Sequence, residues 1–310
     1  MKRTCVIGGG GFIGQHTVRR LLASGRDVIV LGRRAVSPLD PGVEYCSISP
    51  GASKQLQSVL ARADEVIDLA YSTWPQTSFQ DPVKDIHDNL ASSVRVFEYL
   101  LQSNVNRVVY VSSGGTVYGH AHRTPMGEEH ATDPVSPYGI TKLAIEKYGL
   151  MFHTTKGLPI VIVRPSNAYG EGQSPFRGQG FVSTAIASGL RGQSVQVYGE
   201  EGTVRDYVHA EDVATGIFAA LEHGSIGEVY NIGTGIGTTN LGIVEALRPM
   251  LVSAGIRLDV MQLPARAFDV KVNVLSADKL RRASGWQPRI DLTSGLRRTV
   301  EWLLKERPAE

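Results

Sequence analysis

The sequence has few of the features that mark disulfide-stabilised, membrane-spanning or nucleic-acid-binding proteins. It has only two cysteines among 310 residues, Cys5 and Cys46, and their spacing suits neither a disulfide framework nor a metal site. No apolar run approaches the roughly 20 residues that a membrane-spanning helix needs. The net charge of +2, from 32 basic and 30 acidic side chains, is too balanced to indicate binding to nucleic acid or to a membrane surface.

The first residues do not have the pattern of a signal peptide, because Lys2 and Arg3 precede only a short apolar stretch before a glycine cluster. Together with the scarcity of cysteine, this predicts a cytoplasmic protein. The composition is that of an ordinary globular chain, 42% hydrophobic and 20% charged. A chain of this length exceeds what one hydrophobic core usually serves, so we expect two lobes.

Short apolar runs alternate with helical patterns along the first half of the chain. The runs are Thr4–Ile7, Val28–Leu31, Val66–Ala70, Val108–Val111 and Ile160–Val163, and the helical patterns lie at 14–24, 53–62, 83–103 and 138–156. Continuous apolar runs of this kind are typical of strands buried on both faces of a parallel sheet. The alternation predicts an α/β fold with a doubly wound, Rossmann-like parallel sheet.

Three glycines, Gly8, Gly11 and Gly14, connect the first strand to the first helix. Glycine lets the backbone approach a diphosphate closely, and the helix N-terminus offers free N–H donors to it. A glycine-rich turn without a ligand is the alternative, but the flanking strand and helix favour dinucleotide binding. We therefore predict a dinucleotide-binding domain over residues 1–168.

The regular alternation of apolar runs and helical patterns ends near Arg164, and glycine-rich loops follow. Residues 169–310 are predicted to form a smaller α/β substrate-binding lobe. Segments around 205–235 are expected to return to the first domain.

The second strand ends in Arg33 and Arg34, where an acidic residue is expected to bind the adenosine ribose of NAD. Two arginines at this place can bind a 2′-phosphate and so favour NADP. Solvated loop residues are the other interpretation. NAD is the cofactor we expect, with NADP left open by this pair.

Tyr138 and Lys142 open a helix after Pro137 and share one of its faces. A phenol has an ordinary pKa of about 10, so a phenolate base at neutral pH needs about 4 kcal/mol of stabilisation, which a neighbouring ammonium can provide. The alternative is a surface pair without a catalytic role. An earlier strand ends in the hydroxyls of Ser112, Ser113 and Thr116, which act either in chemistry or as caps of the turn.

These motifs and several later ones resemble the extended short-chain dehydrogenases/reductases, specifically the nucleotide-sugar 4-epimerase family. The matching segments are Gly8–Gly14, Ser112–Gly119, Ser136–Lys142, Arg164–Asn167, Val204–His209 with Asp212–Ala214, Tyr230–Gly233, Arg266–Asp269 and Gly285–Trp286. The resemblance covers nearly the whole chain. It implies a UDP-sugar 4-epimerase that works through a 4-keto intermediate on a bound nicotinamide cofactor.

The resemblance also implies roles for individual residues. The catalytic set is Tyr138 as the base, with Lys142, Thr116 and Ser113. The cofactor-binding set is Gly8, Gly11, Phe12, Ile13, Gly14, Arg33, Ala70, Asn89, Tyr138, Lys142 and Pro165. The substrate-binding set is Ser72, Thr116, Asn167, Gln196, Tyr198, Arg205, Arg266, Asp269 and Asn273. No metal is expected.

The sequence departs from the family pattern at two places that bear on the substrate. The usual catalytic hydroxyl position falls on Gly114, so the role passes to Ser113 or Thr116, of which we favour Thr116. Gly114 and Gly115 also lack the acidic pair of the dehydratases, which disfavours dehydration.

Asn273 stands where a tyrosine restricts the pocket beside the sugar's C2 substituent. UDP-N-acetylglucosamine and UDP-N-acetylgalactosamine are therefore expected substrates, with UDP-glucose and UDP-galactose as further ones. Its alternative role is to cap backbone groups.

Two other functions stay open at the level of sequence. They are an NADPH-dependent ketone reductase of the same superfamily and a cofactor-sensing module without catalysis. His209 is interpreted as a hydrogen-bonded structural residue. A homodimer is expected through the helices at 83–103 and 138–156, with Val94, Phe97 and Leu101 on one and Leu143 and Tyr148 on the other.

Overall fold

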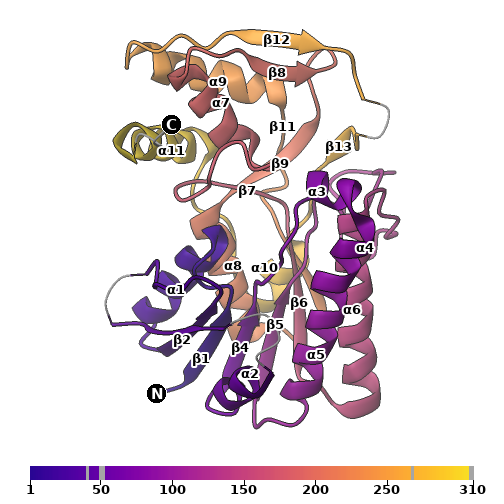
Figure 1. Ribbon diagram of the computed structural model, residues 1–310. Helices are drawn as coiled ribbons and strands as arrows, with labels where there is room; N and C mark the ends of the chain where they lie inside the picture. The colour runs from indigo at the N-terminus through magenta and orange to yellow at the C-terminus, as the bar shows by residue number, and fades with distance from the viewer. Residues whose placement is uncertain (40–41, 49–52, 267–268, 307–310) are drawn as a thin grey trace.

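The computed structural model describes residues 1–39, 42–48, 53–266 and 269–306 (Figure 1). Its larger sheet has seven parallel strands in the order β10-β6-β5-β4-β1-β2-β3. The strands are β1 (Arg3–Ile7), β2 (Asp27–Gly32), β3 (Glu44–Ser47), β4 (Glu65–Asp68), β5 (Arg107–Val111), β6 (Ile160–Pro165) and β10 (Val229–Ile232). The predicted doubly wound sheet is confirmed.

All five apolar runs of the sequence are strands of this sheet. The sequence reasoning missed β3, because it is an edge strand with exposed ends at Glu44 and Ser47 rather than a continuous apolar run. β10 lies beside β6, far from it along the chain, and α8 (Ala210–His223) packs against α1 (Phe12–Ala23). The division of the chain at residue 168 stays a prediction.

Helices cover both faces of the sheet (Figure 1). One face packs against α1, α8 and α10 (Asp278–Ser284), with Val18, Ile217 and Leu280 in the shared core. The other face packs against α2 (Ser53–Leu60), α5 (Ala91–Leu100) and α6 (Pro137–Lys156), with Phe97 and Ile145 in that core. Burial on both faces explains why the strands read as continuous apolar runs.

The helix expected over 83–103 is confirmed up to Leu100, where the chain is helical throughout as α4 (Pro82–Asp85), one turn of π-helix η1 (Ile86–Leu90) and α5 in succession. A further short helix that the sequence reasoning missed, α3 (Pro75–Gln80), precedes it. The Asn89 side chain donates from Nδ2 to the carbonyl oxygen of Asp85 at 3.0 Å. In an α-helix that oxygen accepts the backbone N–H of Asn89 itself, so the side-chain bond accompanies the local change of helix type.

The second lobe is built on β9 (Val204–His209), which pairs with β7 (Asn167–Tyr169), β11 (Gly237–Thr239) and β13 (Val272–Asn273). β8 (Val195–Tyr198) pairs with β12 (Val260–Leu263). The helices α7 (Phe181–Leu190), α9 (Asn240–Val252) and α11 (Leu292–Glu306) enclose a separate core that includes Ile186, Leu247 and Leu303. None of the helices in the described parts of the chain is long and apolar enough to cross a membrane.

Candidate active site

The glycine turn follows β1, which has β2 on one side and β4 on the other, so the strand order of the sheet reverses at β1. Ligands of doubly wound sheets bind outside the carboxyl ends of the strands at such a point. Gly8 has a φ of +81°, and a Cβ on Gly14 would lie 2.4 Å from the Gly8 oxygen. No described side chain caps the start of α1 at Gly11. The N–H groups of its first turn therefore suit the diphosphate of a dinucleotide.

Tyr138 and Lys142 are both buried in the first turns of α6, where the predicted i, i+4 pair shares one face. Ser136 caps the helix by accepting the Gly139 N–H at 3.1 Å. Lys142 Nζ donates to the carbonyl oxygen of Val111 at 2.9 Å. This bond fixes the ammonium at the carboxyl end of β5, beside the hydroxyl-rich strand end.

The Lys142 ammonium lies among aromatic rings as well as carboxylates. It is 4.2 Å from the Tyr71 ring centroid, 5.1 Å from that of Tyr110 and 6.0 Å from that of Tyr138. Burial lowers the pKa of Lys142, and Asp68 is the strongest of the acids that oppose the shift. The rings and the acids together keep a desolvated cation in this position.

Sequence reasoning missed Tyr71 and Asp85. The Tyr71 ring meets the Tyr138 ring edge-on, with centroids 4.8 Å apart. Its hydroxyl lies 3.4 Å from both carboxylate oxygens of Asp85, which is fully buried and also accepts a bond from Thr73. The only signal in the sequence was the place of Tyr71 directly after a strand end.

The hydroxyl beside Tyr138 is that of Ser113. Burial raises the pKa of Tyr138, and a hydrogen bond with the Ser113 side chain opposes the shift. The Thr116 hydroxyl instead donates to the backbone oxygen of Ser113 at 3.4 Å. This geometry favours Ser113 as the hydroxyl partner of Tyr138, whereas the sequence reasoning preferred Thr116.

The structure also explains the glycine at position 114. A Cβ there would lie 2.4 Å from Leu275 Cδ1 and 2.9 Å from the Arg164 carbonyl oxygen. Gly114 also donates its N–H to the carbonyl oxygen of Pro165 at 2.8 Å. The space that a side chain needs is thus filled by the protein itself.

Asn89, predicted to bind the cofactor, has its side chain engaged by the protein. Its Oδ1 accepts the Ser72 N–H at 2.7 Å and the Ser72 hydroxyl at 2.9 Å. Its Nδ2 donates to Thr73 and to the backbone of Asp85. Through these bonds Asn89 braces the loop after β4, and its contact with a cofactor stays a prediction. Ser72 lies in that loop, and Ala70 precedes it and donates to Asp68 at 3.0 Å.

Two asparagines present buried oxygens near Gly114 and Gly115. Asn273 Nδ2 donates to the Gly114 carbonyl oxygen at 3.0 Å, while its Oδ1 has no hydrogen-bond partner in the described structure. Asn167 Oδ1 is also buried and also has no hydrogen-bond partner among the described residues; it lies 3.3 Å from where a Cβ on Gly115 would be. Unpaired buried oxygens are costly unless a ligand satisfies them, so they indicate a binding site.

The remaining predicted substrate residues come together in the second lobe. Asn273 pairs with Arg205 in the register of β13 and β9. The Arg266 guanidinium lies 4.0 Å over the Tyr198 ring and 2.9 Å from Asp269. The Tyr198 hydroxyl donates to Gln196 at 3.0 Å.

Four further residues considered in the sequence analysis can be placed by their surroundings. Burial lowers the pKa of Arg205, because a desolvated guanidinium is destabilised in its charged form. His209 Nδ1 accepts the Glu211 N–H at 3.2 Å and caps α8, so the structural interpretation of this histidine is confirmed. Arg33 and Arg34 follow β2 and are exposed.

A doubly wound sheet with a glycine turn at its switch point and a buried tyrosine–lysine pair on one helix defines an extended short-chain dehydrogenase/reductase. The family described as the NAD dependent epimerase/dehydratase family matches residues 4–233. The chain belongs to this family and is an NAD-dependent enzyme of it. NAD as the expected cofactor is thereby confirmed.

Relatives with solved structures include two UDP-glucose 4-epimerases. The enzyme of Thermotoga maritima, solved with UDP-glucose, is 32% identical with a TM-score of 0.92 and covers 98% of this chain and 99% of its own. The enzyme of Thermus thermophilus, solved with NAD, is 33% identical with a TM-score of 0.89 and covers 99% and 100%. A dTDP-glucose 4,6-dehydratase of Streptomyces niveus is 31% identical over 317 residues, covering 97% of this chain and 92% of that protein.

Proposed function

We propose that the protein is a UDP-sugar 4-epimerase. The observation that carries this proposal is the placing of Tyr138, Ser113 and Lys142 at one end of a site whose other walls hold the unpaired oxygens of Asn167 and Asn273. Arg205 and Arg266 supply permanently charged donors for a diphosphate, which an uncharged ketone does not require. The likeness to two UDP-glucose 4-epimerases supports the same substrate class.

Each residue of the catalytic set has a distinct role. Tyr138 takes the proton from the sugar's O4 hydroxyl, and Ser113 donates a hydrogen bond to the phenolate oxygen. Lys142, whose Nζ lies 6.0 Å from the Tyr138 ring centroid, supplies a positive charge that favours the phenolate. NAD, when bound by the glycine turn and Lys142, supplies the hydride acceptor for C4. The 4-keto sugar then rotates so that its other face is reduced, and Tyr138 returns the proton to O4.

Dehydration is the activity of some relatives, and the strand end of this chain argues against it. Elimination of a hydroxyl requires a side-chain acid and a base beyond the phenol. Gly114 and Gly115 stand where the dehydratases have the acidic pair, and Leu275 with the Arg164 carbonyl fills the space at Gly114. The strand end therefore favours epimerisation over loss of water.

Incubating the purified protein with UDP-sugars, without added cofactor, tests the proposal. We expect the 4-epimers to form, because a hydride that returns to the same substrate leaves the cofactor unchanged. Denaturing the protein should then release NAD. A requirement for added NADPH would support a ketone reductase, and the absence of any turnover would support a non-catalytic module.

The sugar preference depends on Asn273. Its Oδ1 is buried without a partner in the described structure, and asparagine is smaller than the tyrosine that restricts the pocket in the family it resembles. We infer that UDP-N-acetylglucosamine and UDP-N-acetylgalactosamine are turned over at least as well as UDP-glucose and UDP-galactose. The polar edge of this residue supports recognition of an acetamido group.

Replacing Asn273 with tyrosine is expected to lower kcat/KM about tenfold or more for the N-acetylated pair while sparing the plain hexoses. The ring would occupy the space beside C2. An Asn273→Ser variant, which keeps the space and removes the amide, serves as the control: it should keep the turnover of the plain hexoses and lose less of the N-acetylated turnover than the tyrosine variant does. Equal losses on both pairs in the tyrosine variant would show that Asn273 does not gate the sugar.

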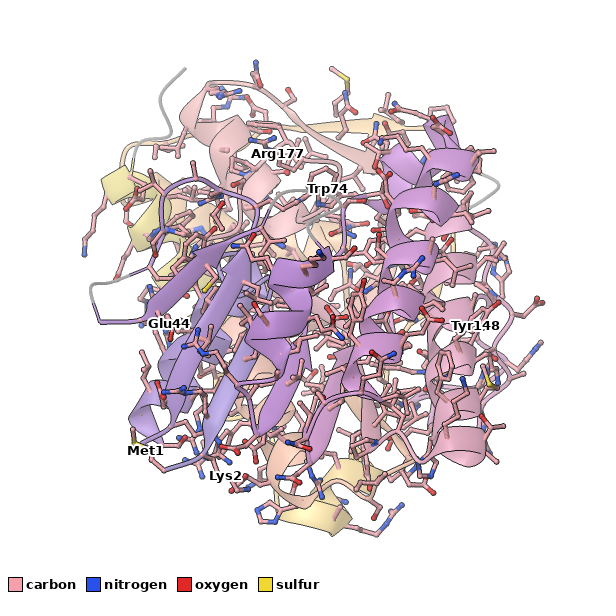
Figure 2. The ribbon with its side chains drawn as sticks, turned by 60° about the horizontal axis from the view of Figure 1, so that its bottom comes forward. Met1, Lys2, Glu44, Trp74, Tyr148 and Arg177 are labelled. Atoms are coloured by element: carbon pink, nitrogen blue, oxygen red, sulfur yellow. The ribbon has the colours of Figure 1, made fainter. Side chains whose placement is uncertain are left out.

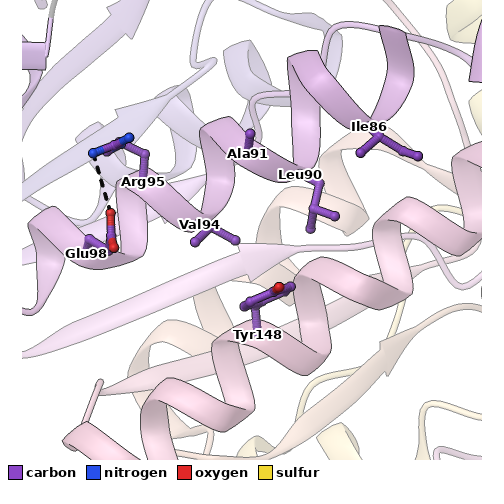
Figure 3. Close-up of a pocket in the computed structure, with 7 residues that line it drawn as sticks. All are labelled: Ile86, Leu90, Ala91, Val94, Arg95, Glu98 and Tyr148. Atoms are coloured by element: carbon purple, nitrogen blue, oxygen red, sulfur yellow. Dashed lines mark ion pairs between the residues drawn. The ribbon is translucent and has the colours of Figure 1, made fainter. Parts of the chain in front are cut away.

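We further propose a homodimer formed by η1, α5 and α6. A groove of about 390 Å³ runs between them and is lined by Ile86, Leu90, Ala91, Val94, Arg95, Glu98 and Tyr148 (Figure 3). Tyr148 and Ile86 are 42% and 50% exposed, and Tyr148 lies at the outer edge of the molecule (Figure 2). Phe97, predicted for the same face, is fully buried in the protein's own core. A second copy placing its own helices on this groove would cover the exposed apolar side chains.

Light scattering of the wild-type protein at micromolar concentration is expected to give the mass of two chains. An Ile86→Glu variant should shift the protein to monomer, because the interface would bury an unpaired carboxylate. Ile236→Glu makes the same change at another exposed isoleucine, 69% exposed in the second lobe, and should stay dimeric. A wild-type monomer would reject the proposal.

A further inference from the structure

The loop Gly170–Gln173, which we name the strap, leads from β7 toward α7 and lies against the start of α1. His16 on α1 has its Nε2 2.8 Å from the backbone oxygen of Glu171. Because that oxygen can only accept, the His16 Nε2 carries the proton and donates. A Cβ on Gly172 would lie 3.7 Å from the Phe12 ring. The strap therefore touches the first turn of the helix that begins at the glycine turn.

The Glu171 carboxylate is held from two other elements. Its oxygens lie 2.9 Å from His209 Nε2 and 2.7 Å from Arg298 Nε of α11. His209 Nδ1 accepts the Glu211 N–H, which leaves Nε2 as the ring nitrogen on the Glu171 side. Burial alone would raise the pKa of Glu171, but hydrogen bonds from His209 and Arg298 lower it to about 2. The carboxylate is thus ionised at neutral pH.

The far end of the strap is also anchored. Gln173 Nε2 donates to the carbonyl oxygen of Ala168 at 3.0 Å, and Ser183 of α7 donates to Gln173 Oε1 at 3.4 Å. Glu171 therefore joins the start of α1 in the larger lobe to α11 in the second lobe. Glu171 thus contacts three elements that are distant in the sequence: α1 through His16, β9 through His209 and α11 through Arg298.

We propose that Glu171 is a positioning residue that holds the strap on α1 and so slows the release of NAD from the glycine turn. The first turn of α1 supplies the N–H donors for the diphosphate, and His16 lies one turn further along the same helix. Fixing this segment to the second lobe limits the opening motions through which a bound dinucleotide leaves. The inference rests on the proposed function only in that the protein binds NAD.

The test compares NAD dissociation from the full-length holoprotein and from Glu171→Ala, measured by dilution into an NAD-consuming trap without any sugar. We expect release to accelerate about tenfold or more, since the charge-assisted hydrogen bond from Arg298 and the close contact with His209 are lost. With saturating NAD added, kcat for epimerisation should stay within about threefold of wild type. Because the release assay needs no sugar, it gives an answer even where the proposed epimerase activity fails.

Glu211→Gln is the matched control. Glu211 is the other partner of Arg298, at 2.7 Å, and its side chain is 52% exposed. This variant should release NAD at the wild-type rate. If Glu171→Ala does not fold, His16→Ala takes its place, since it removes only the bond between α1 and the strap. Release within twofold of wild type in the folded variant, or equal acceleration in Glu211→Gln, would overturn the proposal.

Discussion

Replacing Tyr138 with phenylalanine is expected to lower the rate of epimerisation by about 10²- to 10⁴-fold, the usual effect of losing a general base. The phenol oxygen is the group proposed to take the O4 proton, and the Ser113 side chain hydrogen-bonds to it. The ring itself stays, and so does its edge-on contact with Tyr71 at 4.8 Å. The melting temperature should therefore change little. Initial rates on a UDP-sugar, with bound NAD quantified for each preparation, make the measurement.

Tyr110→Phe is the matched control for this variant. Its hydroxyl is also buried, but it has no hydrogen-bond partner among the described residues. Removing it should change the rate by less than about threefold, since no proton transfer depends on it. A Tyr138→Phe variant that keeps more than about a tenth of the wild-type rate would contradict the assignment of the base.

Replacing Arg164 with leucine is expected to reduce the free energy of unfolding by about 3–5 kcal/mol, because it leaves a buried carboxylate without its counter-ion. Arg164 Nε lies 3.0 Å from Glu146 Oε1 and Nη2 lies 2.6 Å from Oε2. The two side chains are only 6% and 1% exposed. Urea denaturation followed by circular dichroism measures the loss.

The double variant Arg164→Leu with Glu146→Leu separates the ion pair from the packing. Removing both charges should restore most of the lost stability, because an apolar pair of similar size is often neutral relative to a buried ion pair. The guanidinium also lies 4.9 Å over the Tyr118 ring, so part of the loss should remain. A double variant as unstable as the single one would show that Arg164 acts through packing alone.

The sequence by itself determined the architecture of the larger lobe. Strands buried on both faces read as apolar runs, and each of the five runs is a strand of the sheet. The glycine turn and the Tyr138–Lys142 pair are local patterns as well, one at a strand-to-helix junction and one at i, i+4 on a helix. Neighbours along the chain are neighbours in space in such patterns, so they can be recognised before folding is known.

The edge strand β3 and the π-helical turn before α5 were not predictable in the same way. β3 is stabilised by pairing with β2, and its four residues show no clear alternation of buried and exposed side chains. The π-helical turn accompanies a side-chain bond of Asn89 that depends on where the loop after β4 lies. In both cases the deciding partner is outside the segment.

Only the tertiary structure decided how the site is assembled. Ser113 rather than Thr116 faces Tyr138 because the backbone turns between them, and Gly114 is required because Leu275, distant in the sequence, fills its space. His16 and Glu171 meet although 155 positions separate them. Such contacts arise when the two lobes pack, and a hydrogen bond between distant segments leaves no periodic signal in either of them. The local patterns therefore identified the Tyr138–Lys142 pair, while packing between distant segments determined its surroundings.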